Sequence, residues 1–171
     1  KYGLLAYTTL TNGLTMPKDK RFYLNVYSDA LAKKDIEALR DKVDVLIVSM
    51  HWGIEYSHGV SPEQKAIAKY LSSLGVDIII GTHSHVVEPI EYINNTLVIY
   101  SLGNFVSSQI GNEKLTGLVT AVDITKTTID GKSVVKLSNT KADLVYTCKP
   151  NTCGKGKYKV YPYNKLKTAR R

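Results

Sequence analysis

Three of the four histidines in this 171-residue chain directly follow apolar segments, at positions where imidazoles could bind a metal ion. His83 and His85 come just after the apolar run 76–80, and His51 follows the run 43–50 in the same way. Imidazole is the commonest metal ligand, and a His-x-His pair in extended backbone directs both rings to one side. Each histidine could instead be an ordinary loop residue. The repeated placement nevertheless favours a metal site formed by all three.

The two apolar runs have the length and β-branched composition of buried strands, and a helix is predicted between them. Ser61 can cap this helix, Pro62 suits its first position, and Gln64 completes a capping box. Strand, helix and strand within about 40 residues form a βαβ unit, so the strands at 44–50 and 76–81 should be parallel. Ligands bind beyond the carboxyl ends of such strands, which is where the histidines lie.

The remaining segments predict a fold that is α/β first and antiparallel β afterwards. Periodicity and turn signals give the following expected elements: a buried strand at 2–9, a short extended piece at 23–27, a helix at 30–42, a hairpin of 89–93 and 96–101 with its turn at Asn94-Asn95, and strands at 117–125, 133–137, 142–148 and 158–162, with a turn at Asp130-Gly131. We expect one domain over 1–171, with a site-bearing α/β part at 1–105 and a β-rich basic part at 106–171.

The positive charge is concentrated in the second part of the chain. Residues 1–125 hold 11 Lys/Arg and 13 Asp/Glu, whereas residues 126–171 hold 12 and 2. Such a segment could attract a polyanion, for example teichoic acid, an acidic polypeptide or nucleic acid. It could equally be a solvated β edge that lysines protect from aggregation. Nucleic acid is not expected, because no recognition motif accompanies the charge.

The two cysteines, Cys148 and Cys153, favour a disulfide that closes a small loop, because two cysteines cannot complete a zinc site by themselves. A disulfide would indicate an oxidising, extracytoplasmic location. Two free thiols in a cytosolic protein are the alternative. No apolar run approaches the ~18 residues of a membrane span, and nothing at the start reads as a signal peptide. The chain begins at Lys1, so we expect it to be an excerpt from a longer precursor.

Four blocks of the sequence carry a family resemblance. They are Tyr7–Gly13, His51–Tyr56 (HWGIEY), Gly75–Val86 (GVDIIIGTHSHV) and Tyr100–Phe105 (YSLGNF). They resemble the CapA-type proteins of poly-γ-glutamate capsule biosynthesis, which belong to the calcineurin-like metallophosphoesterase superfamily. The resemblance implies a four-layer α/β/β/α sandwich with a two-metal centre at the strand ends. It also implies a bacterial cell-surface protein, extracytoplasmic and membrane-anchored through a segment that is not in this chain.

The resemblance assigns roles to individual residues. His51 is similar to the family's single-histidine ligand, and His83 and His85 to the paired histidines of a Gly-x-His-x-His motif. The implied cofactors are two divalent metal ions (Mn, Zn or Fe). Glu55 is a candidate proton carrier or a carboxylate that orients a ligand, although it could be a surface loop acid. Asn104 is either a catalytic-site residue or an amide that holds the neighbouring turn. His58 matches no ligand motif, and we expect it to be exposed.

The chain also departs from the superfamily pattern. The Asp-x-His, Gly-Asp and Gly-Asn-His blocks are absent, and no histidine precedes His51. These blocks supply the bridging carboxylate and most ligands of one metal, so the chain resembles the C-terminal half of the fold and carries about half of a dinuclear site. We expect the missing N-terminal half to cover sheet surface that is exposed here. We also expect this chain alone to be catalytically inactive.

Three functions remain open at this stage, of which a nucleic-acid-binding module is the least supported and the other two are the main candidates. The first is a cell-surface component of poly-γ-glutamate capsule biosynthesis or export with a hydrolase-like metal site. The second is a non-catalytic extracytoplasmic factor that binds a polyanion or assists assembly on the same fold. The expected partners are an anionic polymer such as poly-γ-glutamate, other capsule synthesis membrane proteins and the missing N-terminal half of the fold.

Overall fold

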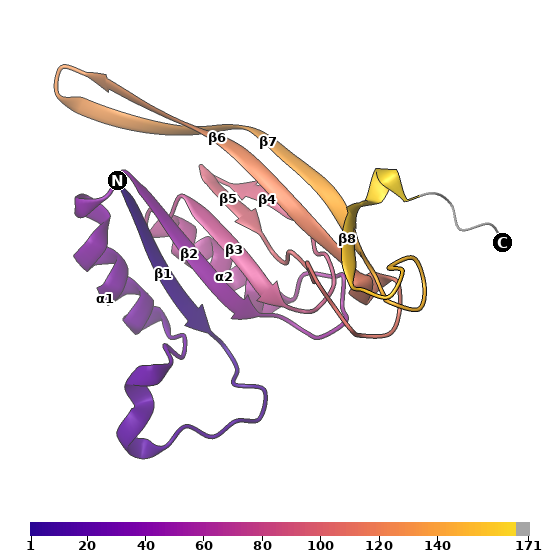
Figure 1. The fold of residues 1–171 in the computed structure, drawn as a ribbon. Coiled ribbons are helices and arrows are strands. Elements are labelled where there is room, and N and C mark those ends of the chain that lie inside the picture. Colours follow the sequence, from indigo (N-terminus) through magenta and orange to yellow (C-terminus); the bar gives the residue numbers. More distant parts are fainter. Residues whose placement is uncertain (167–171) are drawn as a thin grey trace.

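The computed structural model describes residues 1–166, and residues 167–171 lie outside this description (Figure 1). The part of the basic segment that contains Lys167, Arg170 and Arg171 is therefore not described. The elements, in order, are β1 (Tyr2–Thr8), η1 (Lys18–Tyr23), α1 (Asp29–Leu39), η2 (Arg40–Lys42), β2 (Val45–Trp52), α2 (Pro62–Ser73), β3 (Ile78–His83), β4 (Ile90–Ile93), β5 (Thr96–Ile99), η3 (Glu113–Leu115), β6 (Thr116–Ile129), β7 (Lys132–Cys148), β8 (Lys159–Pro162) and η4 (Tyr163–Lys165).

A five-stranded sheet in the order β1-β2-β3-β5-β4 carries the histidines. Strands β1, β2, β3 and β5 are parallel, and β4 pairs with β5 in an antiparallel hairpin. The predicted βαβ unit and the predicted hairpin are therefore confirmed. The start of α2 is also as expected, because the Ser61 hydroxyl oxygen accepts a hydrogen bond from the Gln64 backbone N–H, and the Gln64 side-chain oxygen accepts one from the Ser61 backbone N–H. Gly75 follows the helix with φ +84°, a conformation that favours glycine.

Both faces of this sheet bury apolar side chains, against helices on one side and strands on the other (Figure 1). The helix side is packed by side chains of β2, α1 and α2: Leu46, Val48, Met50, Trp52, Ala32, Ile36, Ile67, Ala68 and Leu71. The opposite side packs under the antiparallel sheet β6-β7-β8, through Val45, Ile78, Leu97, Ile99, Leu118, Val122, Ile124, Val135 and Leu137. The described residues thus form three layers, α/β/β. The second helical layer of the expected four-layer sandwich is not formed by residues 1–166 and stays a prediction.

Three expectations about individual strands need correction. The predicted strands 133–137 and 142–148 are one strand, β7, which continues through an irregularity opposite Ala121 and Asp123 because β6 pairs with it along its whole length. Segment 23–27 makes only an isolated bridge, between Val26 and Thr8, and 3-10 turns of η1 precede it.

The third correction concerns β1, which was expected to be a buried strand. Gly3 and Tyr7 are buried on the helix side, but Tyr2 and Leu4 are 70% and 67% exposed on the other. The β6–β7 hairpin covers the sheet over β2, β3 and β5 and leaves this edge of the open face uncovered. An exposed apolar strand face of this kind usually marks a surface that another segment or protein covers.

A closed loop lies at the carboxyl end of β7, before β8. Cys148 and Cys153 form a disulfide, as predicted. Cys148 is fully buried, and the nearby Lys149 ammonium donates a hydrogen bond to the Ser108 carbonyl at 2.9 Å. The loop is therefore joined to the segment that follows Asn104. Among the described residues, no helix combines the length and apolarity that crossing a membrane requires.

Candidate functional site

The carboxyl ends of β2 and β3 bring His51, His83 and His85 together. The ring centroids of His51 and His83 are 4.5 Å apart, and those of His83 and His85 are 6.3 Å apart. We call these three side chains the imidazole cluster. The parallel register that places His51 beside Thr82 explains the proximity, since both strands end at the same sheet edge.

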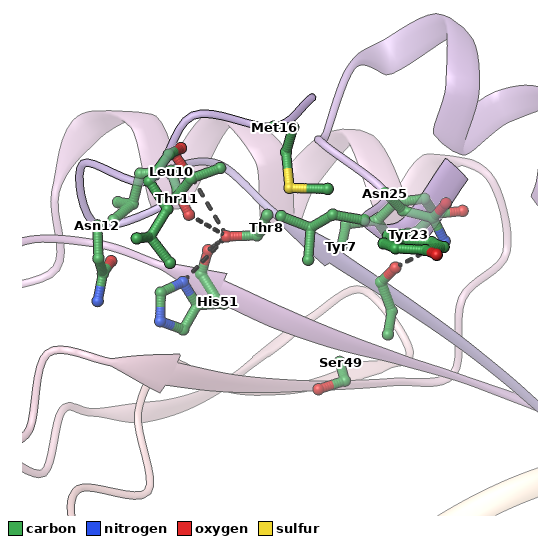
Figure 2. Close-up of a pocket in the computed structure, with 13 residues that line it drawn as sticks. Tyr7, Thr8, Leu10, Thr11, Asn12, Met16, Tyr23, Asn25, Ser49 and His51 are labelled. Carbon is green, nitrogen blue, oxygen red and sulfur yellow. Dashed lines mark hydrogen bonds between the residues drawn. The ribbon is translucent and has the colours of Figure 1, made fainter. Parts of the chain in front are cut away.

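The His51 ring is held by a threonine of the neighbouring strand (Figure 2). The Thr8 hydroxyl donates to the Leu10 carbonyl, so its oxygen is left to accept from His51 Nδ1 at 3.0 Å. A neutral imidazole with its proton on Nδ1 carries its lone pair on Nε2. His51 can therefore bind a metal ion through Nε2.

His83 is the strained and incompletely bonded member of the imidazole cluster. Its backbone has φ +102°, in the region that β-carbon-bearing residues rarely adopt. Its Nδ1 atom is buried without a hydrogen-bond partner among the described residues. Burial lowers the pKa of His83, the nearby His51 lowers it further, and Glu55 opposes the change. A neutral imidazole with an unpaired buried nitrogen is the form in which histidine binds metals.

Asn104 fixes the orientation of His85. The Asn104 Nδ2 group donates to the carbonyls of Lys114 and His85 and to the side chain of Gln109, at 3.0, 3.2 and 3.1 Å. These acceptors require Nδ2 on their side, so Oδ1 is the atom that faces His85 Nδ1 at 3.1 Å. His85 therefore donates through Nδ1 and presents its Nε2 lone pair. The amide also ties together the loop after β5, so both roles considered for Asn104 from the sequence are compatible with its position.

Glu55 lies on the open side of His85. Its Oε1 is 3.8 Å from His85 Nε2, beyond hydrogen-bond distance, and its side chain is 43% exposed. The ring of the next residue, Tyr56, stacks on the His85 ring with centroids 5.7 Å apart. Glu55 is thus positioned to exchange protons with solvent and with the imidazole cluster, and its catalytic role stays a prediction. His58 is exposed, as expected, and its Nδ1 is 2.8 Å from the Val87 carbonyl.

Close backbone packing holds the strand ends at the site. A β-carbon on Gly81 would overlap the Tyr100 carbonyl and the indole of Trp52. The buried Trp52 donates from Nε1 to that same carbonyl at 2.9 Å. Only glycine at position 81 lets β3 approach the segment after β5 this closely. Gly81 therefore sets the position of His83, two residues further along.

A buried carboxyl in the segment between β3 and β4 was missed by sequence reasoning. Glu88 is 2% exposed, and its Oε2 accepts from the Gln64 Nε2 at 2.7 Å. Its other oxygen, Oε1, is buried with no partner among the described residues, and burial raises the pKa of this carboxyl. The Gln64 amide also fills the space beside Gly53, which has φ +92°. The capping box revealed Gln64, but nothing in the sequence indicated that Glu88 is its second partner.

The imidazole cluster fits part of a metal centre. The unpaired His83 Nδ1 and the two available Nε2 atoms are suitable ligand atoms. As the side chains stand, however, no three His, Cys, Asp or Glu residues within 1–166 are placed to hold one ion together. Zinc sites need four ligands, and larger divalent ions need more. The residues present therefore fit a centre whose remaining ligands come from outside this set.

A pocket of about 630 Å³ opens beside His51 at the uncovered edge of β1 (Figure 2). Figure 2 shows Met16 and Tyr23 on one side of it and Ser49 and His51 on the other. Its walls are mainly apolar and come from β1, the following loop and the chain around Leu24, including Ala6, Leu10, Leu14 and Asn25. The pocket thus connects the exposed face of β1 with the imidazole cluster.

Comparison with known proteins gives matches to relatives that are named for capsule, PGA or polyglutamine synthesis. The PGA biosynthesis protein CapA of Bacillus subtilis (strain 168) is 38% identical over 94 residues, which are 55% of this chain and 22% of that protein. The capsule biosynthesis protein CapA of Bacillus anthracis is 37% identical over 100 residues, 57% of this chain and 24% of that protein. A probable polyglutamine synthesis accessory protein of Mycobacterium tuberculosis is 35% identical over 68 residues, 40% of this chain and 18% of that protein.

These alignments cover less than a quarter of each relative, so the chain matches only a part of their length. Residues 1–109 of this chain contain β1, β2 and β3, together with all three members of the imidazole cluster. The family model described as bacterial capsule synthesis protein PGA_cap matches residues 1–109, more than half of the chain. The chain therefore belongs to the PGA_cap family of bacterial capsule synthesis proteins.

Proposed function

We propose that this chain is the C-terminal, site-bearing half of a metal-dependent component of poly-γ-glutamate capsule biosynthesis or export. The observation that carries the proposal is the imidazole cluster at the ends of β2 and β3, in which His83 Nδ1 is buried and unpaired. An unpaired buried nitrogen costs stability, and a metal bond would offset that cost. Membership in the PGA_cap family and the names of the CapA relatives support the capsule context.

His51, His83 and His85 would hold divalent ions such as Mn, Zn or Fe, two of them in the intact protein. Bound ions of this kind supply charge that polarises an ester, phosphate or amide bond and activates a water. Thr8 and Asn104 keep the His51 and His85 rings in the tautomer that leaves Nε2 available. Glu55, 3.8 Å from His85 Nε2, would carry protons to or from this site.

The N-terminal half of the same fold would complete the site. Support comes from the exposed Tyr2 and Leu4 on β1, from the apolar pocket beside His51, and from the small share of each relative that the alignments cover. The N-terminal half would cover the exposed face of β1, add the fourth layer of the sandwich and contribute the bridging carboxylate. Without it, the bridging carboxylate and the second ion's ligands would be missing, so the 171-residue chain alone should be inactive.

We place the intact protein outside the cytoplasm, at the cell surface, anchored through a segment that is not in this chain. The disulfide between Cys148 and Cys153 supports an oxidising compartment. There it would act together with membrane proteins of capsule synthesis and with the anionic polymer itself. This location and these partners are part of the proposal.

The second candidate is a non-catalytic factor that binds the anionic polymer on the same fold. The observation that favours it is a set of exposed lysines on the antiparallel sheet and the segment before β8, namely Lys126, Lys132, Lys136, Lys141, Lys155, Lys157 and Lys159. One of them, Lys126, is already paired with Asp44 at 2.7 Å. The two candidates differ in whether metal is required.

Metal titration of the full-length protein separates them. We expect the metal-free protein to bind Mn²⁺ or Zn²⁺ by calorimetry, and the variants His51→Ala and His83→Ala to lose at least about tenfold in affinity. His58→Ala is the matched control, because His58 is exposed and lies outside the imidazole cluster. Equal affinity in the His83→Ala and His58→Ala variants, or a wild type that binds no metal, would reject the metal-dependent function and leave the polymer-binding factor.

A further inference from the structure

Lys114 lies next to the imidazole cluster, although it is outside the residues that the family model matches. It belongs to the short 3-10 segment η3, and its carbonyl accepts a hydrogen bond from Asn104 Nδ2 at 3.0 Å. The same amide contacts His85 Nδ1 at 3.1 Å through its oxygen. The backbone of Lys114 is therefore fixed to the group that orients His85.

The Lys114 side chain is directed toward the site by an aromatic ring. Its ammonium lies 4.5 Å from the centroid of the Tyr56 ring, which itself stacks on His85. A cation over a tyrosine face at this distance is attracted by the ring electrons. The Lys114 side chain is 25% exposed, so much of its methylene chain is shielded from water while the charge stays beside the cluster.

The charge of Lys114 is only weakly compensated. Among the described residues, its carboxylate neighbour is Glu113, and the two charged atoms are 4.0 Å apart. This separation exceeds a charge-assisted hydrogen bond, for which about 2.7–2.9 Å is usual. An ammonium has three donors, so Lys114 can still bind an incoming anion. The carboxylate closest to the cluster, Glu55, contacts His85 rather than Lys114.

We propose that Lys114, held against Tyr56, binds a carboxylate of the anionic polymer and so positions the polymer chain over the imidazole cluster. This inference rests on the proposed function, because it takes the polymer of that function as the ligand. Lys114 would bind a negatively charged side group of the polymer. The imidazole cluster would then face the polymer backbone. The basic surface of β6–β8 can attract the polymer through its charge, but it does not position the polymer over the imidazole cluster.

The test is binding of a fluorescent γ-glutamate oligomer to the full-length protein, at about 0.15 M salt to suppress long-range attraction. We expect Lys114→Gln to weaken binding about tenfold or more, since a hydrogen bond between charged groups is lost. Lys114→Arg should retain most of the affinity. Lys69→Gln, on the exposed side of α2, removes the same charge and should bind like the wild type. Thermal unfolding verifies that each variant is folded.

Two further oligomers identify the ligand group. A neutral γ-glutamine oligomer should bind weakly to every variant, and a polyphosphate should be less sensitive to Lys114→Gln than the γ-glutamate oligomer. Equal affinities of Lys114→Gln and Lys69→Gln for the γ-glutamate oligomer would overturn this inference alone. A Lys114→Gln variant that loses affinity for polyphosphate but not for the γ-glutamate oligomer would also overturn this inference, because Lys114 would then not bind carboxylates. A wild type that does not bind the γ-glutamate oligomer would overturn the polymer assigned in the proposed function and this inference with it.

Discussion

Replacing Asn104 with aspartate should destabilise the protein more than replacing it with alanine, although aspartate has nearly the same shape. The Asn104 Nδ2 group faces oxygen acceptors on Lys114, His85 and Gln109 at 3.0–3.2 Å, and the Ser107 hydroxyl at 3.4 Å. Aspartate would place a second carboxylate oxygen against these acceptors. Alanine removes the donors but leaves space that water can enter at this partly exposed site.

The size of the effect follows from the hydrogen bonds. An amide nitrogen has two protons, so about two of these bonds are formed at full strength, at roughly 1 kcal/mol each. Asn104→Ala should therefore lower the free energy of unfolding by about 2 kcal/mol, which corresponds to a decrease in Tm of roughly 4–8 °C in a chain of this size. Asn104→Asp should cost at least about 1 kcal/mol more, because it adds repulsion between oxygens to the same loss.

Urea unfolding at neutral pH measures both variants, and the ¹⁵N chemical shifts of the His85 ring report its tautomer. We expect the wild type to carry the His85 proton on Nδ1. An aspartate variant as stable as the alanine variant would mean that the amide is turned the other way. In that case, the Nε2 lone pair assigned to His85 would be wrong, and the ligand role of that atom would have to be withdrawn.

Three other predictions concern groups that support the site. Burial raises the pKa of Glu88, so the protonated carboxyl stabilises the fold below the ordinary glutamate pKa, and this stability is lost as pH rises through the folded-state value. The free energy of unfolding of the wild type should therefore fall more than that of Glu88→Gln between about pH 5 and pH 8 in urea unfolding. Parallel losses would contradict the raised pKa of Glu88. Gly81→Ala should cost more than about 2 kcal/mol because its methyl group overlaps the Tyr100 carbonyl, and an unchanged Tm would refute the close approach. Cys153→Ser should lower the free energy of unfolding by about 2 kcal/mol, because the loop is no longer closed by the disulfide. A reductant should lower the Tm of the wild type but not that of Cys153→Ser. A wild-type Tm that does not change with reductant would contradict a stabilising disulfide.

Much of the site-bearing part follows from local sequence signals. The capping box at Ser61, the glycine after α2 and the two β-branched runs together predict a βαβ unit, and the unit places the histidines at one sheet edge. These signals depend on residues close together in the chain. Backbone sterics and hydrogen-bond geometry act on them in much the same way in any protein.

The remaining features depend on contacts between distant segments. The two predicted strands before Cys148 merge into β7 because β6, which begins at Thr116, pairs along its full length. Glu88 acquires its partner from α2, 24 residues earlier in the chain. Lys114 reaches the imidazole cluster only through Tyr56 and Asn104. No local pattern distinguishes these residues from ordinary loop acids and surface lysines, so they could be assigned only once the strands were assembled.

The most direct test of the metal-centre proposal is an anomalous diffraction map of the full-length protein crystallised with Mn²⁺ or Zn²⁺. The proposal predicts an anomalous peak about 2.1 Å from Nδ1 of His83, with His51 or His85 bound through Nε2. The other ligands should come from residues outside this chain, water or substrate. A metal bound away from the imidazole cluster, or a His83 Nδ1 that is hydrogen-bonded to another protein group in the complete molecule, would contradict it.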